Sequence, residues 1–433
     1  MTLKKTTLTM ALLAFGLMAT AQERPVLRLS LEEAQQYAVE HNAAMQNADL
    51  EVKKAELNRW KTLSTMLPQV KAGFDYQNMC GYEMHMGSGP MSISIPMDPN
   101  GNFSVTASVA LTGAQIVGTM LQNIAMQMSD ITRQQTEQST RSNVKNVYVS
   151  ILVMEQTIGL LDSSLANLES LAATSQAAVN VGAAEQVDAD KLQVQVASLK
   201  SSINSTKRSL QALRNSMLLQ LGADVNATLE LTTPIDNILS VDNATQLLGQ
   251  GFDITRNFNY KLLEQNEELA KRNVTMAWMD FTPTLSAYYQ YSKKVYFGEE
   301  GMNMTPPNMV GASISVPLLT VGTRVSNIKS AKIDLQEAVN SRRQAEDGLR
   351  VQYNQLCYDL ASALENYDIQ NRNLEVTQRV FNNITEKYNY GRASSLEVTN
   401  ASTDIISAQS NYIQAVMNVV SAQIALENLL NIE

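Results

Sequence analysis

Side chains that could carry out chemistry are scarce in this sequence. The 433 residues include two histidines, His41 and His85, and two cysteines, Cys80 and Cys357. Neither histidine lies in a recognisable catalytic triad or metal-binding motif, and the sequence has no glycine-rich phosphate-binding loop. The carboxylates are scattered along polar helical faces. We therefore predict no catalytic residues, no cofactor and no resident metal, and we infer that the protein is not an enzyme.

Two methionine-rich segments contain the remaining candidates for metal ligands. Thioether, thiol and imidazole groups are the ligands that Cu(I) prefers. The spacing here matches no tight ligand motif, so we interpret both segments as methionine-rich loop surface, and the sequence leaves open whether they bind metal. The residues are Met79, Cys80, Met84, His85, Met86, Met91, Met97, Met302, Met304 and Met309.

The N-terminus predicts an exported protein. Lys4 and Lys5 precede an apolar stretch from Leu8 to Met18, and small residues follow at positions 19–21. These are the three parts of a secretory signal peptide, so we expect residues 1–21 to be removed. The apolar stretch is too short to span a bilayer, and we expect no transmembrane helix later in the chain.

The charge of the chain bears on its partners. The formal net charge is −9, and loss of Lys4 and Lys5 with the signal peptide makes it −11. An acidic surface repels the phosphate backbone of nucleic acids. We therefore expect no nucleic-acid partner.

The chain contains an internal repeat of about half its length. In each half a helical segment, Leu31 to Thr62 and then Asn257 to Trp278, ends near a proline. Several residues recur at a nearly constant offset, and the same order of predicted elements follows in both halves. The matching pairs are Asn42 and Asn257, Ala55 and Ala270, Pro68 and Pro283, and Gly182 and Gly391.

Each half then predicts one pair of β-strands. Apolar residues occupy every second position, which is typical of a strand with two different faces. A loop rich in Gly, Pro and Met separates the two strands of each pair. The alternating residues are Val70, Ala72, Phe74 and Tyr76 with Phe103, Val105, Ala107 and Val109, and then Leu285, Ala287, Tyr289 and Tyr291 with Val310, Ala312, Ile314 and Val316.

Two very long helices are predicted after the strand pairs. The segments from Gly118 to Gly182 and from Gly322 to Gly391 contain no proline. Roughly 65 residues at 1.5 Å rise each make a rod of about 100 Å, whereas an average helix has about 12 residues. The helices that follow each turn carry a 3.5-residue apolar period, which indicates coiled-coil packing. Its positions are Leu192, Val196, Leu199, Ile203, Thr206, Leu210, Leu213 and Met217, and Ala401, Ile405, Ala408, Tyr412, Ala415, Val419, Ala422 and Leu426.

Four amphipathic strands cannot close a barrel by themselves. An open sheet in lipid leaves its edge amides and carbonyls unpaired, which costs several kcal/mol for each group. The strands therefore need partners, and copies of the same chain related by cyclic symmetry can supply them. We predict a homo-oligomer.

These elements, in this order and spacing, resemble the TolC family of outer-membrane efflux proteins over essentially the whole mature chain. The resemblance implies a mainly α fold with a small β part. It implies a trimer in which four strands per protomer contribute to a 12-stranded outer-membrane barrel, with coiled-coil helices forming a periplasmic tunnel. The motifs that carry it are Leu29-Ser30-Leu31-Glu32-Glu33-Ala34, Leu67-Pro68-Gln69-Val70 and Gly391 with Ser395-Leu396-Glu397-Val398.

The same resemblance implies a division of the chain. Residues 22–222 are expected to form the first structural repeat and residues 255–433 the second. The polar segment 223–254, interrupted by Pro234, is expected to connect them at an equatorial belt.

The function implied is that of a passive exit duct in a tripartite efflux or type I secretion system. The implied partners are a periplasmic adaptor, an inner-membrane transporter and the lipid of the outer membrane. The cargo (drug, metal, small molecule or protein) and the particular pump and adaptor stay open. The alternative is a secreted structural coiled coil, a stalk or spacer, which explains the long helices but not the strand pairs.

The resemblance also assigns residues at the periplasmic end. Gly182 and Gly391 are expected at the hairpin tips where the adaptor docks. Tyr388 matches a gate tyrosine, and Asp188 matches its carboxylate partner on the other hairpin. Alternatively, Asp188 is a first-turn acid that stabilises a helix N-terminus, and Tyr388 only packs.

Two further positions are expected to line the aperture. Glu397 matches the first acid of a ring that selects cations, although it also fits a first-turn acid of a helix. The second ring acid falls on Asn400, and the family's gate arginine falls on Ala393, beside Arg392. These departures leave open whether the aperture is closed at rest.

Overall fold

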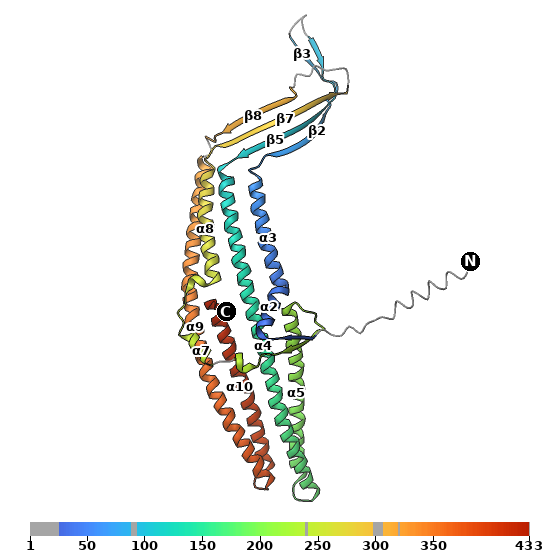
Figure 1. Ribbon diagram of the computed structural model, residues 1–433, viewed down its shortest axis with the longest axis vertical. Helices are drawn as coiled ribbons and strands as arrows, with labels where there is room; N and C mark the ends of the chain where they lie inside the picture. Colours follow the sequence, from blue (N-terminus) through green and yellow to red (C-terminus); the bar gives the residue numbers. More distant parts are fainter. Residues whose placement is uncertain (1–25, 88–92, 239–240, 298–305, 319–320, 433) are drawn as a thin grey trace, which may run out of the picture. The chain divides into compact units, whose positions relative to one another are not determined.

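A computed structural model describes residues 26–87, 93–238, 241–297, 306–318 and 321–432 (Figure 1). The predicted signal peptide and Met91, Met302 and Met304 lie outside these residues. The chain divides into two compact units. One contains Met1–Asn47, Gln135–Asp253 and Arg350–Glu433, and the other contains Ala48–Gln134 and Ile254–Leu349. Each unit therefore takes segments from both sequence repeats.

The second unit contains a four-stranded antiparallel sheet in the order β2-β5-β7-β8 (Figure 1). The sheet joins the two repeats, because β5 of the first repeat pairs with β7 of the second. All four predicted strands are present. Their bounds are β2 Gln69–Gln77, β5 Asn100–Leu111, β7 Thr284–Tyr296 and β8 Asn308–Ser315.

Long helices continue from this sheet. The helix α4, Gly113–Asn180, has 68 residues, and α9, Val321–Asn389, has 69, so both predicted rods are present. Within the second unit α4 lies beside α3, Ala43–Ser64, where Arg133 Nε donates to Asp49 Oδ1 at 2.5 Å.

An ion-pair cluster joins α9 to α8, Phe258–Met279, in the same unit. The Glu267 carboxylate accepts from Lys271 Nζ at 2.7 Å and from Arg342 Nε at 2.7 Å, and Arg342 also donates to the Tyr260 hydroxyl. The Glu267 side chain is only 13% exposed. Hydrogen bonds from Lys271 and Arg342 therefore hold the pKa of Glu267 below its usual value.

Replacing Glu267 by Gln is expected to lower the stability of the protein by about 1 kcal/mol at neutral pH. A depressed carboxyl pKa contributes stability above the unfolded-state pKa, and this contribution is lost as pH falls through the folded-state pKa. The difference between Glu267→Gln and wild type should therefore shrink below pH 4.5. Denaturant midpoints by circular dichroism measure this, with the exposed neighbour Glu264→Gln as control. An equal difference at all pH values would contradict the assignment.

The first unit is built on two helical hairpins. The first hairpin turns at Gly182 into α5, Gln186–Leu221, and the second turns at Gly391 into α10, Ser395–Leu430. Both glycines have positive φ, +75° and +68°, a conformation that a residue with a Cβ adopts only with strain. The predicted 3.5-residue period is confirmed, because every position of both seams is buried or half-buried.

A small parallel sheet in the same unit was not predicted. The strand β1, Val26–Leu29, pairs with β6, Thr228–Leu231. Short helices follow in the connecting segment: α6 Ile235–Ile238, α7 Val241–Leu248 and the 3₁₀ turn η2 Ile254–Arg256. These two strands are additional to the four strands that were predicted. Strands of four residues are too short to show a clear alternation, and a parallel pair distant in sequence leaves no turn signal.

The first methionine-rich segment also contains strands that the sequence analysis assigned to a loop. The strand β3, Glu83–Met86, pairs antiparallel with β4, Ile93–Pro96. The residues of both strands are exposed. The hairpin is held by its own backbone pairing, with little burial to mark it in the sequence.

The predicted helix from Leu31 to Thr62 is broken at Asn42. It consists of α2, Leu31–His41, and α3, and Asn42 between them has an extended backbone with φ −66° and ψ 133°. The Asn42 amide donates to the Gln220 carbonyl at 2.6 Å, and its oxygen accepts from Ala44 N at 2.7 Å. The side chain thus satisfies an amide in the first turn of α3 and a carbonyl in the last turn of α5.

Among the described residues two helices, α4 and α10, are long and apolar enough to cross a membrane by length and composition alone. The expectation that no later segment meets this test is therefore wrong. Packed core helices also pass it, and α10 buries Ser402, Gln409 and Gln423 among its apolar residues. The test is thus weak evidence for a span in either helix.

Candidate channel wall and aperture

The four-stranded sheet has one apolar face. Pairing aligns the alternating residues, so that Phe74 lies opposite Phe103, Ala107 opposite Tyr289, and Tyr289 opposite Val310. Several of these side chains are highly exposed, among them Val70 at 69%, Val310 at 79% and Ile314 at 69%. A continuous exposed apolar face of this kind requires a cover, such as lipid or another protein.

The opposite face of the same sheet is polar. The register aligns Lys71 with Thr106 and Thr106 with Gln290, and Ser286 with Ser313. The hydroxyls of Ser286 and Ser313 are 2.7 Å apart, within hydrogen-bond distance. Apolar residues on one face and polar residues on the other are the arrangement of a membrane barrel strand, with lipid on one side and water on the other.

The edges of this sheet are β2 and β8. Within the described residues each pairs with a strand on one side only, β2 with β5 and β8 with β7. Their outer rows of amides and carbonyls are therefore available for further strands. An edge of this kind is stable in lipid only when a further strand closes it.

At the tips of the two helical hairpins the structure brings Asp188 and Ser395 together. Ser395 is buried at the start of α10, and its Oγ donates to Asp188 Oδ1 at 2.5 Å. Lys191 Nζ lies 3.9 Å from the same carboxylate oxygen. The carboxylate expected to be the partner of Tyr388 thus accepts a hydrogen bond from Ser395, a residue to which the sequence assigned no role in the aperture.

The other predicted aperture residues lie on the second hairpin, which α9 and α10 form. Tyr388 is half-buried and packs against the apolar cluster that includes Leu168, Leu192 and Val398, in keeping with the packing alternative. Asn400 is exposed. None of these contacts tests a role in a channel, so the aperture assignment stays a prediction.

Glu397 completes the N-terminal cap of α10. Its carboxylate accepts from Ser394 N at 2.7 Å and from Ser394 Oγ at 2.9 Å, while Ser394 Oγ accepts from Glu397 N, a capping box. The hydrogen bonds from the Ser394 backbone and side chain lower the pKa of Glu397. Glu397 is exposed, so the same carboxylate is ionised and open to solvent at neutral pH.

The described residues contain no group of three or more His, Cys, Asp or Glu side chains that could hold a metal ion. Cys80 is exposed and Cys357 half-buried, and both thiols are free. The methionine-rich hairpin therefore presents thioethers together with single imidazole and thiol groups, without a carboxylate cluster.

A family model for outer membrane efflux proteins matches residues 255–431, which span the second repeat. These residues are thus similar to the outer membrane efflux protein family. The resemblance to TolC-family channels drawn from the sequence is thereby confirmed.

Solved outer-membrane channels share the fold over nearly the whole chain. The outer membrane protein VceC of Vibrio cholerae is 14% identical with a TM-score of 0.74, over 92% of this chain and 95% of its own. The MtrE outer membrane channel of Neisseria gonorrhoeae is 16% identical with a TM-score of 0.74, over 93% and 89%. The Campylobacter jejuni CmeC outer membrane channel is 13% identical with a TM-score of 0.72, over 92% and 85%. No curated protein matches the chain.

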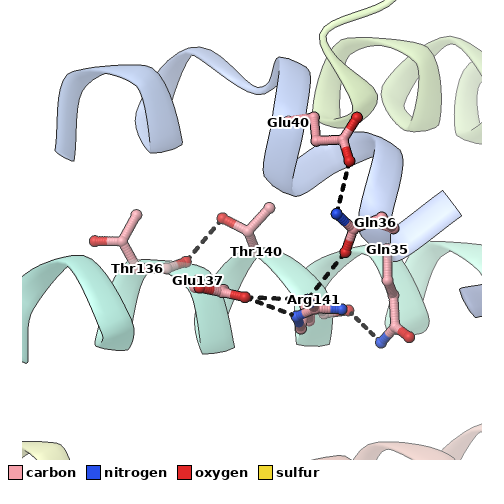
Figure 2. A network of polar contacts seen from close by, with 7 residues as sticks. All are labelled: Gln35, Gln36, Glu40, Thr136, Glu137, Thr140 and Arg141. Atoms are coloured by element: carbon pink, nitrogen blue, oxygen red, sulfur yellow. Dashed lines mark hydrogen bonds and ion pairs between the residues drawn. The ribbon is translucent and has the colours of Figure 1, made fainter. Parts of the chain in front are cut away.

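In the first unit a polar network joins α2 to α4 (Figure 2). Arg141 donates to Gln36 Oε1 at 3.3 Å and pairs with Glu137 at 3.0 Å, while its carbonyl accepts from Gln35 at 3.1 Å. Gln36 also donates to Glu40. The network leaves no signal in the sequence, because its members come from helices about 100 residues apart and follow no motif.

An open cavity of about 370 Å³ lies near this network. Two of the residues that line it, Thr136 and Thr140, also belong to the network in Figure 2. Asn42 and Gln220, which are bonded to each other, line it as well. Asn42, at the break between α2 and α3, therefore forms part of this recess.

Proposed function

We propose that this outer membrane efflux protein is the exit duct of a tripartite efflux or type I secretion system, through which substrates pass passively to the outside. The observation that supports it most directly is the sheet with one exposed apolar face, one polar face and two open edges. Outer-membrane lipid covers the apolar face, and the polar face lines water. The long helices project into the periplasm.

The duct is a homotrimer. Three copies of the sheet supply 12 strands, with β2 of each chain paired to β8 of the next. A closed barrel leaves no unpaired edge amide or carbonyl in the hydrocarbon of the membrane. A single four-stranded sheet cannot meet this requirement, because its two edges stay unpaired.

Glu397 forms a ring of three carboxylates on the threefold axis, where it attracts cations. Its hydrogen bonds with Ser394 support this role, because they fix the carboxylate and keep it ionised to a lower pH than an ordinary glutamate. Asn400 contributes no charge at the position of the second ring.

The hairpin tips dock a periplasmic adaptor, which joins the duct to an inner-membrane transporter. The exposed apolar residues Val181 and Tyr390 beside Gly182 and Gly391 support this, since they are 80% and 73% exposed. Photo-crosslinkers placed at these two residues in living cells should capture an adaptor. Capture of no periplasmic protein by either position would contradict the docking assignment.

Single-channel recording in planar bilayers tests the duct and its ring together. Wild type should give small, cation-selective steps, and Glu397→Gln should reduce the cation selectivity measured by the reversal potential in a salt gradient. Glutamine can keep the capping box, so the variant removes charge without removing the cap. Asn400→Asp, which adds a second carboxylate, should increase the selectivity.

The outcomes separate the two claims. If Glu397→Gln and Asn400→Asp both conduct with the reversal potential of wild type, the protein is still a duct, but Glu397 does not form the selective ring. A well-folded oligomer that inserts but never conducts would contradict the duct and leave the structural stalk as the better account. Because the Glu397 pKa is lowered, wild-type selectivity should persist at pH 5.

A further inference from the structure

The recess beside Asn42 lies within the first unit, and both of its walls are held by hydrogen bonds. One wall is a face of α4, to which α2 is fixed by the bonds of Arg141 with Gln35 and Gln36 (Figure 2). The other wall contains Asn42 and the end of α5, joined by the 2.6 Å bond from Asn42 Nδ2 to the Gln220 carbonyl. A recess whose walls are fixed in this way can bind a ligand with little loss of conformational entropy.

The side chains that line the recess are almost all neutral polar groups. Among the described residues of its lining none is charged, and all but Ala44 carry an amide or a hydroxyl. The nearby charges of Glu137 and Arg141 are paired with each other at 3.0 Å and do not line the recess. An ionic ligand would lose hydration there without meeting an opposite charge, and an apolar ligand would take water away from the polar groups of the lining. The lining therefore favours a ligand that is neutral and rich in hydrogen-bonding groups.

Two residues of the lining have unused hydrogen-bonding capacity in a buried setting. Gln220 Oε1 is buried and has no hydrogen-bond partner among the described residues. Thr140 is only 7% exposed, and its hydroxyl donates to the Thr136 carbonyl at 2.8 Å (Figure 2), so the hydroxyl can serve a ligand as an acceptor. An acceptor that is buried without a partner costs free energy, which an O–H or N–H donor would recover. Carboxylate groups have no such donor, whereas alcohol groups do.

The opening of the recess adds groups that both donate and accept. Ser139 and Asn143 are exposed on one face of α4, four residues apart, and both line the recess. A hydroxyl and a primary amide can each give and take hydrogen bonds. Ala44, on the other wall, is also exposed, and its small side chain leaves room for a ligand. A compound with several alcohol groups on one ring matches this arrangement.

We propose that the recess binds a neutral saccharide through the hydroxyl and amide side chains of α4 and the amide of Gln220. Its volume of about 370 Å³ lies within the range of small-molecule sites, about 300–1,000 Å³, and suits one or two sugar rings. This binding function goes beyond the proposed duct and does not depend on conduction. In the periplasm a neutral saccharide has two sources: cell-wall glycan, whose sugars carry acetamido groups, and free sugars that carry hydroxyl groups alone.

Saturation-transfer-difference NMR on the purified full-length oligomer tests the site with two probes, the trisaccharide of N-acetylglucosamine and maltotriose. The detergent must have no sugar head group, because a glycoside detergent would compete for the recess. Wild type should bind at least one probe with a millimolar or lower Kd. Binding of the N-acetylglucosamine trisaccharide alone would identify cell-wall glycan as the source, and binding of maltotriose would identify free sugars. Binding of neither probe would overturn the proposal.

Two variants remove hydrogen-bonding groups from the recess and keep the size of the side chain. Gln220→Met and Thr140→Val should each weaken binding about fivefold to tenfold, as expected for the loss of roughly one hydrogen bond. Thr157→Val is the matched control, because the Thr157 hydroxyl donates to the Val153 carbonyl of the same helix and Thr157 does not line the recess. A loss of affinity in Thr157→Val as large as that in Thr140→Val would overturn the site.

A second pair of variants blocks the recess without removing any hydrogen-bonding group. Ala44→Trp should fill it from the opening and abolish binding, while Ala43→Trp, at an exposed neighbour that does not line it, should bind as wild type. Size-exclusion chromatography should give the same oligomer for both. Loss of the oligomer in Ala44→Trp alone would mean that a neighbouring copy fills the recess, and this result would overturn the saccharide site.

The failure of this site can be told apart from the failure of the duct, because conductance of the same samples is a separate measurement. Oligomer that conducts but binds neither probe would leave the duct standing and remove the saccharide site. Oligomer that binds a probe, loses it in Ala44→Trp and never conducts would keep the site and contradict the duct.

Discussion

Replacing Ala312 by Arg is expected to abolish assembly in the outer membrane. Ala312 lies near the middle of β8 on the apolar face, opposite Ala287 of β7. An arginine on the lipid face of a barrel costs about 2–4 kcal/mol at the bilayer midplane, and the proposed trimer would carry three of them. Since each 1.4 kcal/mol is a factor of about ten, the amount of heat-modifiable oligomer in outer-membrane fractions should fall at least tenfold.

The neighbouring residue provides the control. Ser313 follows Ala312 directly and lies on the polar face, where it pairs with Ser286. Ser313→Arg loses that hydrogen bond but faces water, so its oligomer should reach the outer membrane at near wild-type amounts. If the two arginines had equal effects, the assignment of the two faces of the sheet would be wrong.

Replacing Gly222 by Ala is expected to destabilise the first unit severely. Gly222 ends α5 with φ +70°, and an added Cβ would lie 2.3 Å from the His41 carbonyl oxygen and 2.7 Å from its carbon. These are backbone atoms at the break between α2 and α3, so they cannot rotate away. The left-handed conformation and the overlap together should cost roughly 3 kcal/mol or more.

Gly182 separates the conformational cost from the clash. It has φ +75° at the hairpin tip, with no atom within 4 Å of an added Cβ among the described residues. Gly182→Ala should therefore cost only about 1–2 kcal/mol. Denaturant unfolding followed by circular dichroism compares the two variants, and a cost for Gly182→Ala as large as that for Gly222→Ala would contradict the packing at His41.

The elements predicted correctly from sequence are those with long, regular periods. The 3.5-residue seam from Leu192 to Met217 and the alternation from Val70 to Tyr76 each repeat enough to identify the element and its buried or lipid-facing side. The turns at Gly182 and Gly391 follow from glycine at the ends of long helices.

What was missed depends on contacts between distant residues. The pairing of β1 with β6 involves two strands of four residues separated by about 200 positions, with no local signal. The break at Asn42 depends on a hydrogen bond to Gln220, so the local helical period continues across it. In the candidate aperture, the hydrogen bond between Ser395 and Asp188 could not be recognised because it joins residues 207 positions apart.

The central claim is that copies of this chain close a barrel through β2 and β8, and cysteine crosslinking tests it most directly. In protein with Cys80 and Cys357 replaced by Ser, a cysteine at Lys71 or Gly73 of β2 is combined with one at Ser313 or Ser315 of β8. The account predicts covalent dimers and closed trimers for at least one pair. As a control, a cysteine at Ser104 of the central strand β5, used in place of the β2 cysteine, should give no crosslinked oligomer. Folded, membrane-inserted protein that yields only monomers from every β2–β8 pair would contradict it.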